Sequence, residues 1–130
     1  MDERLKILVV EDDPVYAEFV ATTLRGAGHE VDIAGSGAAA RERARAWRPD
    51  AVILDLGLPD ESGYEVGRAL RREILGEAAI IILLTASLYP QRDMADAVGI
   101  DIVFSKPVEP QLVTGMVDLI HQRRSTRPGK

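Results

Sequence analysis

The chain has 130 residues and a mass of 14.2 kDa, which is enough for one domain with a buried core and short for two. Its 46% hydrophobic and 28% charged residues are typical of a globular protein, and the net charge of −5 argues against a nucleic-acid-binding surface. A chain without cysteine has no disulfides and no thiol catalysis, and its longest apolar run, 78–84, is too short to span a bilayer. We therefore expect a cytoplasmic protein with neither a membrane nor a nucleic-acid partner.

The chain begins with a predicted strand, an acidic loop and a helix. The apolar run Lys6–Val10 predicts a buried strand, and Glu11, Asp12 and Asp13 follow it directly. Pro14 suits the first turn of a helix, which the glycines at 26 and 28 close. The apolar positions of this helix recur at helical spacing: Val15, Phe19, Val20 and Leu24.

A second strand and helix lead to the central strand. Glu30–Ala34 alternates polar and apolar residues, as a half-buried edge strand does. The turn 35–37 leads into an alanine-rich helix over 38–47, which Trp47 anchors. Ala51–Asp55 then runs without interruption into a carboxylate and a turn rich in glycine and proline, which predicts a strand buried on both faces.

A third helix and a fourth strand follow the central strand. The helix opens at Ser62 or Gly63 and ends at Gly76. Its inward-facing positions are Val66, Leu70 and Ile74. The most apolar run of the chain, 79–84, predicts a strand that finishes in Thr85.

The last third of the chain carries one more strand and two helices. Residues 86–98 form a loop followed by a helix that is short at best, and 101–105 form a strand that ends in Lys106. A final helix begins at Pro110. Its apolar stripe consists of Leu112, Val113, Met116, Val117 and Ile120. Residues 125–130 have nothing to bury and predict a flexible tail.

Strands that alternate with helices predict an α/β fold. Right-handed crossovers place helices on both faces of a parallel sheet, and the common order for five such units is 2-1-3-4-5. We therefore expect a doubly wound, flavodoxin-like five-stranded parallel sheet in a single domain over 1–124, with 125–130 as the tail.

In that strand order, polar residues from four strand ends meet in one crevice. Glu11 and Asp12 follow the first strand, Asp55 ends the third, and Thr85 and Lys106 arrive from the fourth and fifth. Clustered carboxylates need a cation, and oxygen ligands favour Mg²⁺. A phosphoryl group at Asp55 would meet that metal, an ammonium and a hydroxyl. Each residue alone suits a turn, a cap or a strand end, but their coincidence favours a phosphoryl-transfer site.

The sequence resembles the receiver domains of bacterial two-component response regulators from about Lys6 to Ile120. The motifs that carry the resemblance are Ile7-Leu8-Val9-Val10-Glu11-Asp12-Asp13, Ile53-Leu54-Asp55-Leu56-Gly57-Leu58-Pro59-Asp60-Glu61-Ser62-Gly63, Leu84-Thr85-Ala86 and Ser105-Lys106-Pro107. Together these motifs are highly specific. Such a domain is either a free-standing regulator or part of a larger protein such as a hybrid kinase.

The resemblance implies a role for each residue of the crevice. Asp55 is the expected phosphoacceptor, with a histidine kinase or a histidine phosphotransfer protein as donor. Asp12, Asp55 and the backbone carbonyl of Gly57 are implied Mg²⁺ ligands, and Glu11 is implied to act through a metal-bound water. The implied phosphoryl contacts are Lys106 and Thr85. Asp13 is interpreted as the cap of the first helix, and the Lys106–Pro107 bond is expected to be cis.

Two departures from the family pattern affect how a signal would leave the site. Val103 stands where the family often has an aromatic residue, and Phe104 should face the opposite side of the sheet. The interval from Thr85 to Lys106 is about one residue short, which predicts a short or displaced fourth helix. We expect output through the fourth helix, fifth strand and fifth helix, with changes in the 86–91 loop that carries Tyr89 and little change at Val103.

Three other functions compete with this one. Gly35, Gly37 and Ala40 match a dinucleotide-binding fingerprint on paper, with an acidic residue about twenty positions on. That interpretation gives no role to four residues of the crevice: Glu11, Asp12, Thr85 and Lys106. An aspartate-nucleophile phosphatase would need a second acid where Gly57 stands. The third alternative is an interaction module with the same fold that works without phosphorylation.

Overall fold

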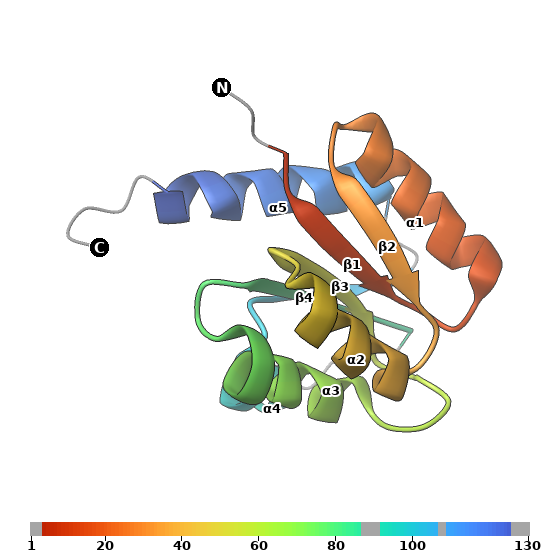
Figure 1. The fold of residues 1–130 in the computed structure, drawn as a ribbon, viewed down its shortest axis with the longest axis vertical. Coiled ribbons are helices and arrows are strands. Elements are labelled where there is room, and N and C mark those ends of the chain that lie inside the picture. Colours follow the sequence, from red (N-terminus) through yellow and green to blue (C-terminus); the bar gives the residue numbers. More distant parts are fainter. Residues whose placement is uncertain (1–3, 87–91, 107–108, 126–130) are drawn as a thin grey trace.

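A parallel sheet forms the centre of the molecule, as the apolar runs predict (Figure 1). The structure is a computed structural model that describes residues 4–86, 92–106 and 109–125. Within these ranges the strands are β1 (Lys6–Val10), β2 (Glu30–Ala34), β3 (Ala51–Asp55), β4 (Ile80–Thr85) and β5 (Ile102–Ser105). All neighbouring strands are parallel and their order is β2-β1-β3-β4-β5. The predicted doubly wound, flavodoxin-like fold is confirmed.

Helices cover both faces of the sheet. One face carries α1 (Pro14–Gly26) and α5 (Pro110–Ser125), which pack against each other. The other face carries α2 (Gly37–Trp47), α3 (Gly63–Ala69) with its continuation η1 (Leu70–Leu75), and α4 (Arg92–Val98), as Figure 1 shows. The described part of α4 has seven residues and directly follows 87–91, which lie outside the described residues, so the expectation of a short or displaced fourth helix stays a prediction.

Alternate strand residues feed two separate hydrophobic cores, because side chains of a strand point to opposite faces in turn. In β3, Val52 and Leu54 pack towards α2, α3 and α4, whereas Ala51 and Ile53 pack towards α1 and α5. All five residues of β3 are buried. The central strand is therefore covered on both sides, and its last residue, Asp55, is placed where both cores end.

Three residues assigned to apolar helix faces lie at the surface instead. Val15 and Phe19 of α1 are 78% and 55% exposed, and Leu112 of α5 is 51% exposed. The residues of α1 that do face the sheet are Ala17, Val20, Ala21 and Leu24. Small alanine side chains let this helix lie close to the sheet, and a pattern that counts only large apolar residues misses them.

The third helix differs from the single α-helix that the sequence predicts. It changes at Leu70 from α-helical to wider π-helical turns, and the Gly76 N–H donates to the Arg71 carbonyl at 3.1 Å, five residues back. Arg71 is buried in this segment, although it is a charged residue. Its guanidinium binds carbonyls and a carboxylate from the segment 76–101.

Two further expectations concern the C-terminal tail and membrane-spanning helices. Helix α5 extends to Ser125, and the remaining tail residues, 126–130, lie outside the described residues. No helix in the described ranges is both long enough and apolar enough to cross a membrane.

Candidate functional site

Three carboxylates meet at the carboxyl edge of the sheet. Strands β1 and β3 are neighbours, so Glu11 and Asp12, which follow β1, lie beside Asp55 at the end of β3. Each of the three offers an oxygen, and these oxygens lie within 4.8 Å of one another. Glu11 and Asp55 are buried, whereas Asp12 is exposed. The prediction that these acids share one crevice is confirmed.

Lys106 comes from the end of β5 and reaches into the same crevice. Its Nζ donates to Glu11 Oε1 at 2.7 Å and lies 3.2 Å from Asp55 Oδ1. The ammonium also lies 4.7 Å from the centre of the Tyr16 ring on α1, within cation–π distance. Tyr16 was not singled out by sequence reasoning, because nothing in the motif around it indicates that a lysine from the other end of the chain will cover its ring.

The charges of the crevice act on one another. Burial raises the pKa of Glu11, although the hydrogen bonds from Lys106 and from the Asp13 N–H pull it down. Burial alone would lower the pKa of Lys106, but the hydrogen bond to Glu11 and the nearby Asp55 carboxylate outweigh it, and the pKa of the lysine is raised. The lysine is therefore positively charged at neutral pH and balances part of the acidic cluster.

Thr85 is held at the end of β4, next to the crevice. It is buried, and its carbonyl accepts a hydrogen bond from the Lys106 backbone N–H at 2.7 Å. In the sheet register Asp55 pairs with Leu84 and Thr85 pairs with Ser105. Thr85 thus lies one residue beyond the level of Asp55, on the strand between Asp55 and Lys106.

The loop after Asp55 folds back on itself. Leu56 donates its N–H to the Leu84 carbonyl at 3.0 Å, and its own carbonyl accepts the Gly63 N–H at 2.7 Å. Gly57 is exposed and pairs with Ser62 across the loop. A Cβ atom at Gly63 would lie 2.5 Å from the Asp55 carbonyl oxygen, so the tight return of the chain requires glycine there.

Asp13 lies beside the cluster and serves the helix that follows. Its side chain accepts the Val15 N–H at 3.1 Å and caps α1. The prediction that Asp13 is a helix cap is confirmed, and the cap accounts for its position next to the acidic pair.

The dinucleotide fingerprint fails on contacts at the N-terminus of α2. A pyrophosphate would need the free backbone N–H groups of that first turn. Asp60 already accepts the N–H groups of Gly37 and Ala38, at 2.8 and 3.0 Å, and Ser36 Oγ accepts the N–H of Ala39 at 3.1 Å. The donors that a bound nucleotide would use are therefore bonded to the protein's own side chains.

The donor atoms of the cluster fit a hard divalent cation. Glu11, Asp12 and Asp55 supply carboxylate oxygens only, and the site has no described histidine near it. Oxygen ligands of this kind, few in number and partly exposed, suit Mg²⁺, which keeps several waters. Lys106 supplies one positive charge against three carboxylates, so the net charge of the cluster also favours a cation.

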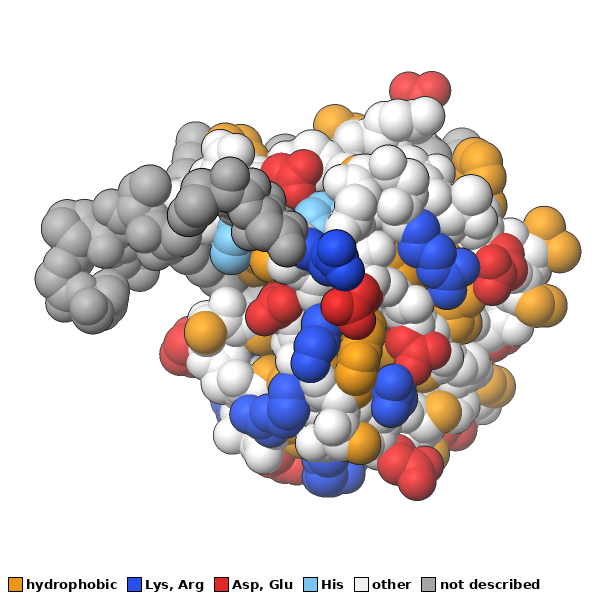
Figure 2. All heavy atoms as spheres, turned by 45° about the horizontal axis from the view of Figure 1, so that its top comes forward, with side chains coloured by type: hydrophobic (Ala, Val, Ile, Leu, Met, Phe, Trp, Pro, Cys, Tyr) orange, Lys and Arg blue, Asp and Glu red, His pale blue; other side chains and the backbone are white. Residues whose placement is uncertain are grey.

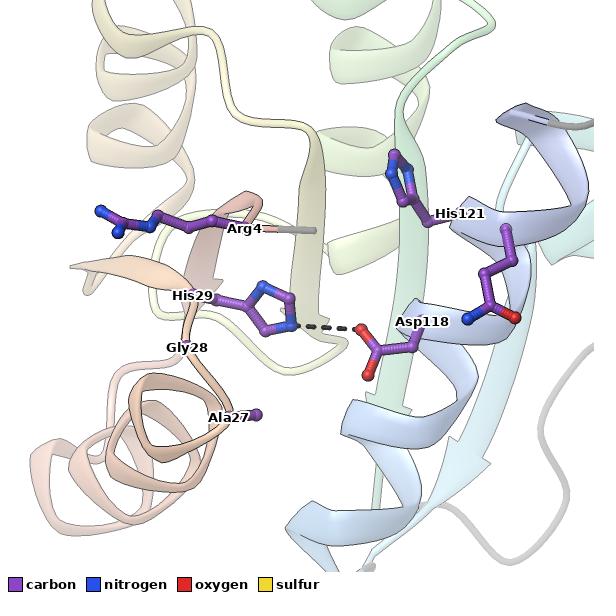
Figure 3. Close-up of a pocket in the computed structure, with 7 residues that line it drawn as sticks. Arg4, Ala27, Gly28, His29, Asp118 and His121 are labelled. Carbon is purple, nitrogen blue, oxygen red and sulfur yellow. Dashed lines mark hydrogen bonds and ion pairs between the residues drawn. The ribbon is translucent and has the colours of Figure 1, made fainter. Parts of the chain in front are cut away.

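A second polar pocket, of about 190 Å³, lies between the start of β1, the α1–β2 connection and the C-terminal half of α5 (Figure 3). His29 and Asp118 point towards each other across it, with 3.1 Å between His29 Nε2 and Asp118 Oδ1. The other ring nitrogen, Nδ1, accepts the Leu5 N–H at 3.1 Å, which leaves the proton on Nε2. Since both nitrogens are engaged, this histidine joins α5 to the sheet and has no lone pair for proton abstraction.

The side chains of Val103 and Phe104 in β5 face opposite sides of the sheet. Val103 packs with the α2–α4 core and Phe104 with the α1–α5 core, so the predicted opposite orientation of these side chains is confirmed. Tyr89 and the rest of 87–91 lie outside the described residues, as does Pro107 with the predicted cis bond.

Comparison with known proteins agrees with this geometry. The chain is 36% identical over 132 residues to the DNA-binding response regulator MtrA of Mycolicibacterium smegmatis, an alignment that covers 98% of this chain and 55% of MtrA. It is 32% identical over 114 residues to the Escherichia coli aerobic respiration control sensor protein ArcB, and this alignment covers 87% of this chain and 15% of ArcB. This chain thus spans about half the length of MtrA and a smaller part of ArcB.

Solved structures and family models give the same answer. The structure of the Vibrio cholerae chemotaxis protein CheY4 superposes with a TM-score of 0.82 at 29% identity, and it covers 88% of this chain and 97% of CheY4. The model of the response regulator receiver domain matches residues 7–118, which include every residue of the crevice. The chain therefore belongs to the response regulator receiver domain family.

Proposed function

We propose that the chain accepts a phosphoryl group on Asp55 from a histidine kinase or a histidine phosphotransfer protein, with Mg²⁺ as cofactor. Receiver domains are phosphoacceptor modules rather than enzymes in the usual sense. The observation that carries the proposal is the convergence of Asp55 with Lys106 and two further carboxylates, with 3.2 Å between Lys106 Nζ and Asp55 Oδ1. A carboxylate nucleophile paired with a fixed cation is suited to phosphoryl transfer.

In the proposed reaction, a carboxylate oxygen of Asp55 attacks the phosphorus of a phosphohistidine. The new O–P bond forms as the N–P bond breaks, and the electron pair of that bond stays on the imidazole nitrogen of the donor. Lys106 pairs with Oδ1 in the resting protein, which leaves Oδ2 as the expected nucleophile. Lys106 and Thr85 then hold the oxygens of the transferred group.

Glu11, Asp12, Asp55 and the carbonyl of Gly57 would hold Mg²⁺. When bound, the ion supplies positive charge next to the phosphoryl oxygens. The chain's own contribution is to keep the acids clustered and oriented before the donor arrives. Glu11 is fixed by Lys106 at 2.7 Å and by the Asp13 N–H at 3.1 Å, so its carboxylate cannot turn away from the site.

Treatment with acetyl phosphate and Mg²⁺ tests the proposal directly. Intact-mass analysis should show one added phosphoryl group per chain, because a small donor needs no protein docking surface. The same treatment with EDTA in place of Mg²⁺ should leave the mass nearly unchanged. An unmodified protein in both samples would favour an interaction module with this fold that works without phosphorylation.

Magnesium should also bind before any phosphate. The three carboxylates repel one another, and the single lysine balances only one of their charges. Millimolar Mg²⁺ is therefore expected to raise the thermal unfolding midpoint by a few degrees, which corresponds to a stabilisation of about 1 kcal/mol. Asp12→Asn should lose most of this rise. Asp13→Asn, which keeps a helix cap on the neighbouring exposed residue, should retain it. An equal rise in both variants would assign the effect to general ionic strength.

The donor protein should dock over the start of α1. A phosphohistidine can reach Asp55 only if its carrier covers the surface around the crevice, and α1 begins directly after the acidic loop. Val15 and Phe19 are exposed there, and Figure 2 shows hydrophobic side chains at the surface on the right-hand side, where α1 lies. Exposed large apolar residues beside a polar crevice are typical of a protein interface.

Replacing Phe19 by alanine should separate protein donors from small ones. We expect Phe19→Ala to slow transfer from a phosphorylated kinase or phosphotransfer protein about tenfold or more, since the complex loses an aromatic contact that the docked donor would bury. Phosphorylation by acetyl phosphate should be unchanged. Leu112→Ala, on α5 and similarly exposed at 51%, is the matched control and should leave both rates near those of the wild type. If Leu112→Ala slows transfer from the protein donor as much as Phe19→Ala does, the donor does not dock specifically over the start of α1.

The output surface remains the face formed by α4, β5 and α5. Met94 of α4 and Leu119 of α5 are 44% and 40% exposed, which gives these elements apolar surface for a partner. Thr85 and Lys106 lie at the ends of β4 and β5, so a change at the phosphoryl group has a short route to this face.

A further inference from the structure

The loop between β3 and α3, residues 56–62, is fastened to the first turn of α2 by two acidic side chains. Asp60 accepts the N–H groups of Gly37 and Ala38 with its two carboxylate oxygens, at 2.8 and 3.0 Å. Glu61 Oε1 pairs with Arg41 Nη2 at 2.6 Å. The loop is therefore bonded at its tip to a helix that supplies none of the proposed ligands.

The first turn of α2 is built to receive this loop. N–H groups in the first turn of a helix have no acceptor within the helix, and Asp60 supplies one to each of the first two. These hydrogen bonds from Gly37 and Ala38 hold the pKa of Asp60 below its usual range. Gly37 is buried under the loop, and a Cβ atom there would lie 2.5 Å from Glu61 Oε2 and 2.7 Å from Glu61 Cγ.

The other end of the loop is fixed to the crevice. Leu56 bonds to the Leu84 carbonyl of β4, and Gly63 bonds back to Leu56. Gly57 pairs with Ser62 and lies between the fixed base of the loop and its bonded tip. The segment that contains Gly57 is therefore held at both ends, at β4 through Leu56 and at α2 through Asp60 and Glu61.

We propose that Asp60 and Glu61 are positioning residues that hold the 56–62 loop in the shape that binds Mg²⁺, and that they couple α2 to the metal site. The inference rests on the proposed function, in which the Gly57 carbonyl is a metal ligand. An untethered loop would have to be ordered each time the ion binds, which lowers the affinity.

The coupling must act in both directions. We call the contacts of Asp60 with Gly37 and Ala38, together with the Glu61–Arg41 ion pair, the loop–α2 joint. If the formed joint strengthens Mg²⁺ binding by some factor, bound Mg²⁺ strengthens the joint by the same factor. The amides of Gly37 and Ala38 report on the joint, because Asp60 is their hydrogen-bond acceptor. Their exchange with solvent should slow when Mg²⁺ binds at a site to which neither residue contributes.

Calorimetric titration of the full chain with Mg²⁺ tests the joint from both sides. Asp60→Ala and Gly37→Ala should each weaken Mg²⁺ binding about fivefold, although one residue is on the loop and the other on α2. Asp60→Asn loses the charge and keeps one of the two acceptor oxygens that bind Gly37 and Ala38, so its affinity should lie between those of Asp60→Ala and the wild type. Glu65→Ala removes an exposed carboxylate from α3 and is the control, with an expected affinity equal to that of the wild type.

Two outcomes would overturn the proposal. If Asp60→Asn and Glu65→Ala bind Mg²⁺ as weakly as Asp60→Ala, the effect comes from overall charge. If amide exchange at Gly37 and Ala38 in the wild-type protein is the same with and without saturating Mg²⁺, the joint is not coupled to the site, whatever the variants do. A wild-type chain that binds no Mg²⁺ and takes no phosphoryl group would instead refute the proposed function itself.

Discussion

Asp55→Asn should abolish phosphorylation by acetyl phosphate completely, with no added mass under conditions that modify every wild-type chain. The amide nitrogen of asparagine is not a nucleophile, and its oxygen carries no full negative charge, so no acyl phosphate can form at this position. Intact-mass analysis measures the result on the whole protein. Peptide mapping of the modified wild type should place the adduct on the peptide that contains Asp55.

The other acids of the crevice are poorly placed to replace Asp55. Glu11 is 5% exposed and its Oε1 is bonded to Lys106, while its Oε2 accepts the Asp13 N–H. Asp12 is exposed and follows β1, which β3 separates from the strand β4 that carries Thr85. We therefore expect no rescue by a neighbouring carboxylate in Asp55→Asn.

The folded state of Asp55→Asn should be as stable as the wild type, or more stable when Mg²⁺ is absent. The substitution is nearly isosteric and removes one of three clustered negative charges. Asp13→Asn is the matched control, because it removes a neighbouring carboxylate and should leave the adduct in place. An adduct that persists in Asp55→Asn, or disappears in Asp13→Asn, would move the acceptor to another residue.

The sequence predicts the sheet and the crevice well because both follow from chain-local signals. Uninterrupted apolar runs mark β3 and β4, and the acid or hydroxyl that ends each run marks the carboxyl edge. Once the strand order is known, Glu11 and Asp55 must meet, since β1 and β3 are neighbours. Because parallel strands end at the same edge of the sheet, residues that are far apart in the sequence come together there.

Contacts between polar side chains and distant backbone groups could not be predicted in this way. Asp60 reads as a turn residue in the sequence, and its partners are the N–H groups of a helix that starts 23 residues earlier in the chain. The burial of Arg71 could not be predicted either, because its acceptors include the backbone carbonyls of Gly76, Ala79 and Gly99. Every residue type has a backbone carbonyl, so nothing in those positions points to an arginine.

Arg71 joins three parts of the fold. Its side chain is 4% exposed and pairs with Asp101, whose carboxylate oxygen lies 2.9 Å away. The same oxygen accepts the Ile81 N–H of β4 at 2.8 Å. Gly99 has φ +87 and leaves room for the arginine, since a Cβ atom there would lie 2.8 Å from Arg71 Cγ. The guanidinium thus ties η1 to the start of β4 and to the connection between α4 and β5.

Arg71→Ala should cost about 3–5 kcal/mol of unfolding free energy, the usual effect of removing one partner of a buried ion pair. Asp101 and the carbonyls bound by the guanidinium would lose the hydrogen bonds that Arg71 donates, in a region with little access for water. Arg72→Ala is the control on the adjacent residue, which is exposed and gives one hydrogen bond, to the Ala97 carbonyl at 3.0 Å. It should cost about 1 kcal/mol or less. Urea unfolding followed by Trp47 fluorescence measures both, and equal losses would show that the Arg71 joint does not stabilise the fold.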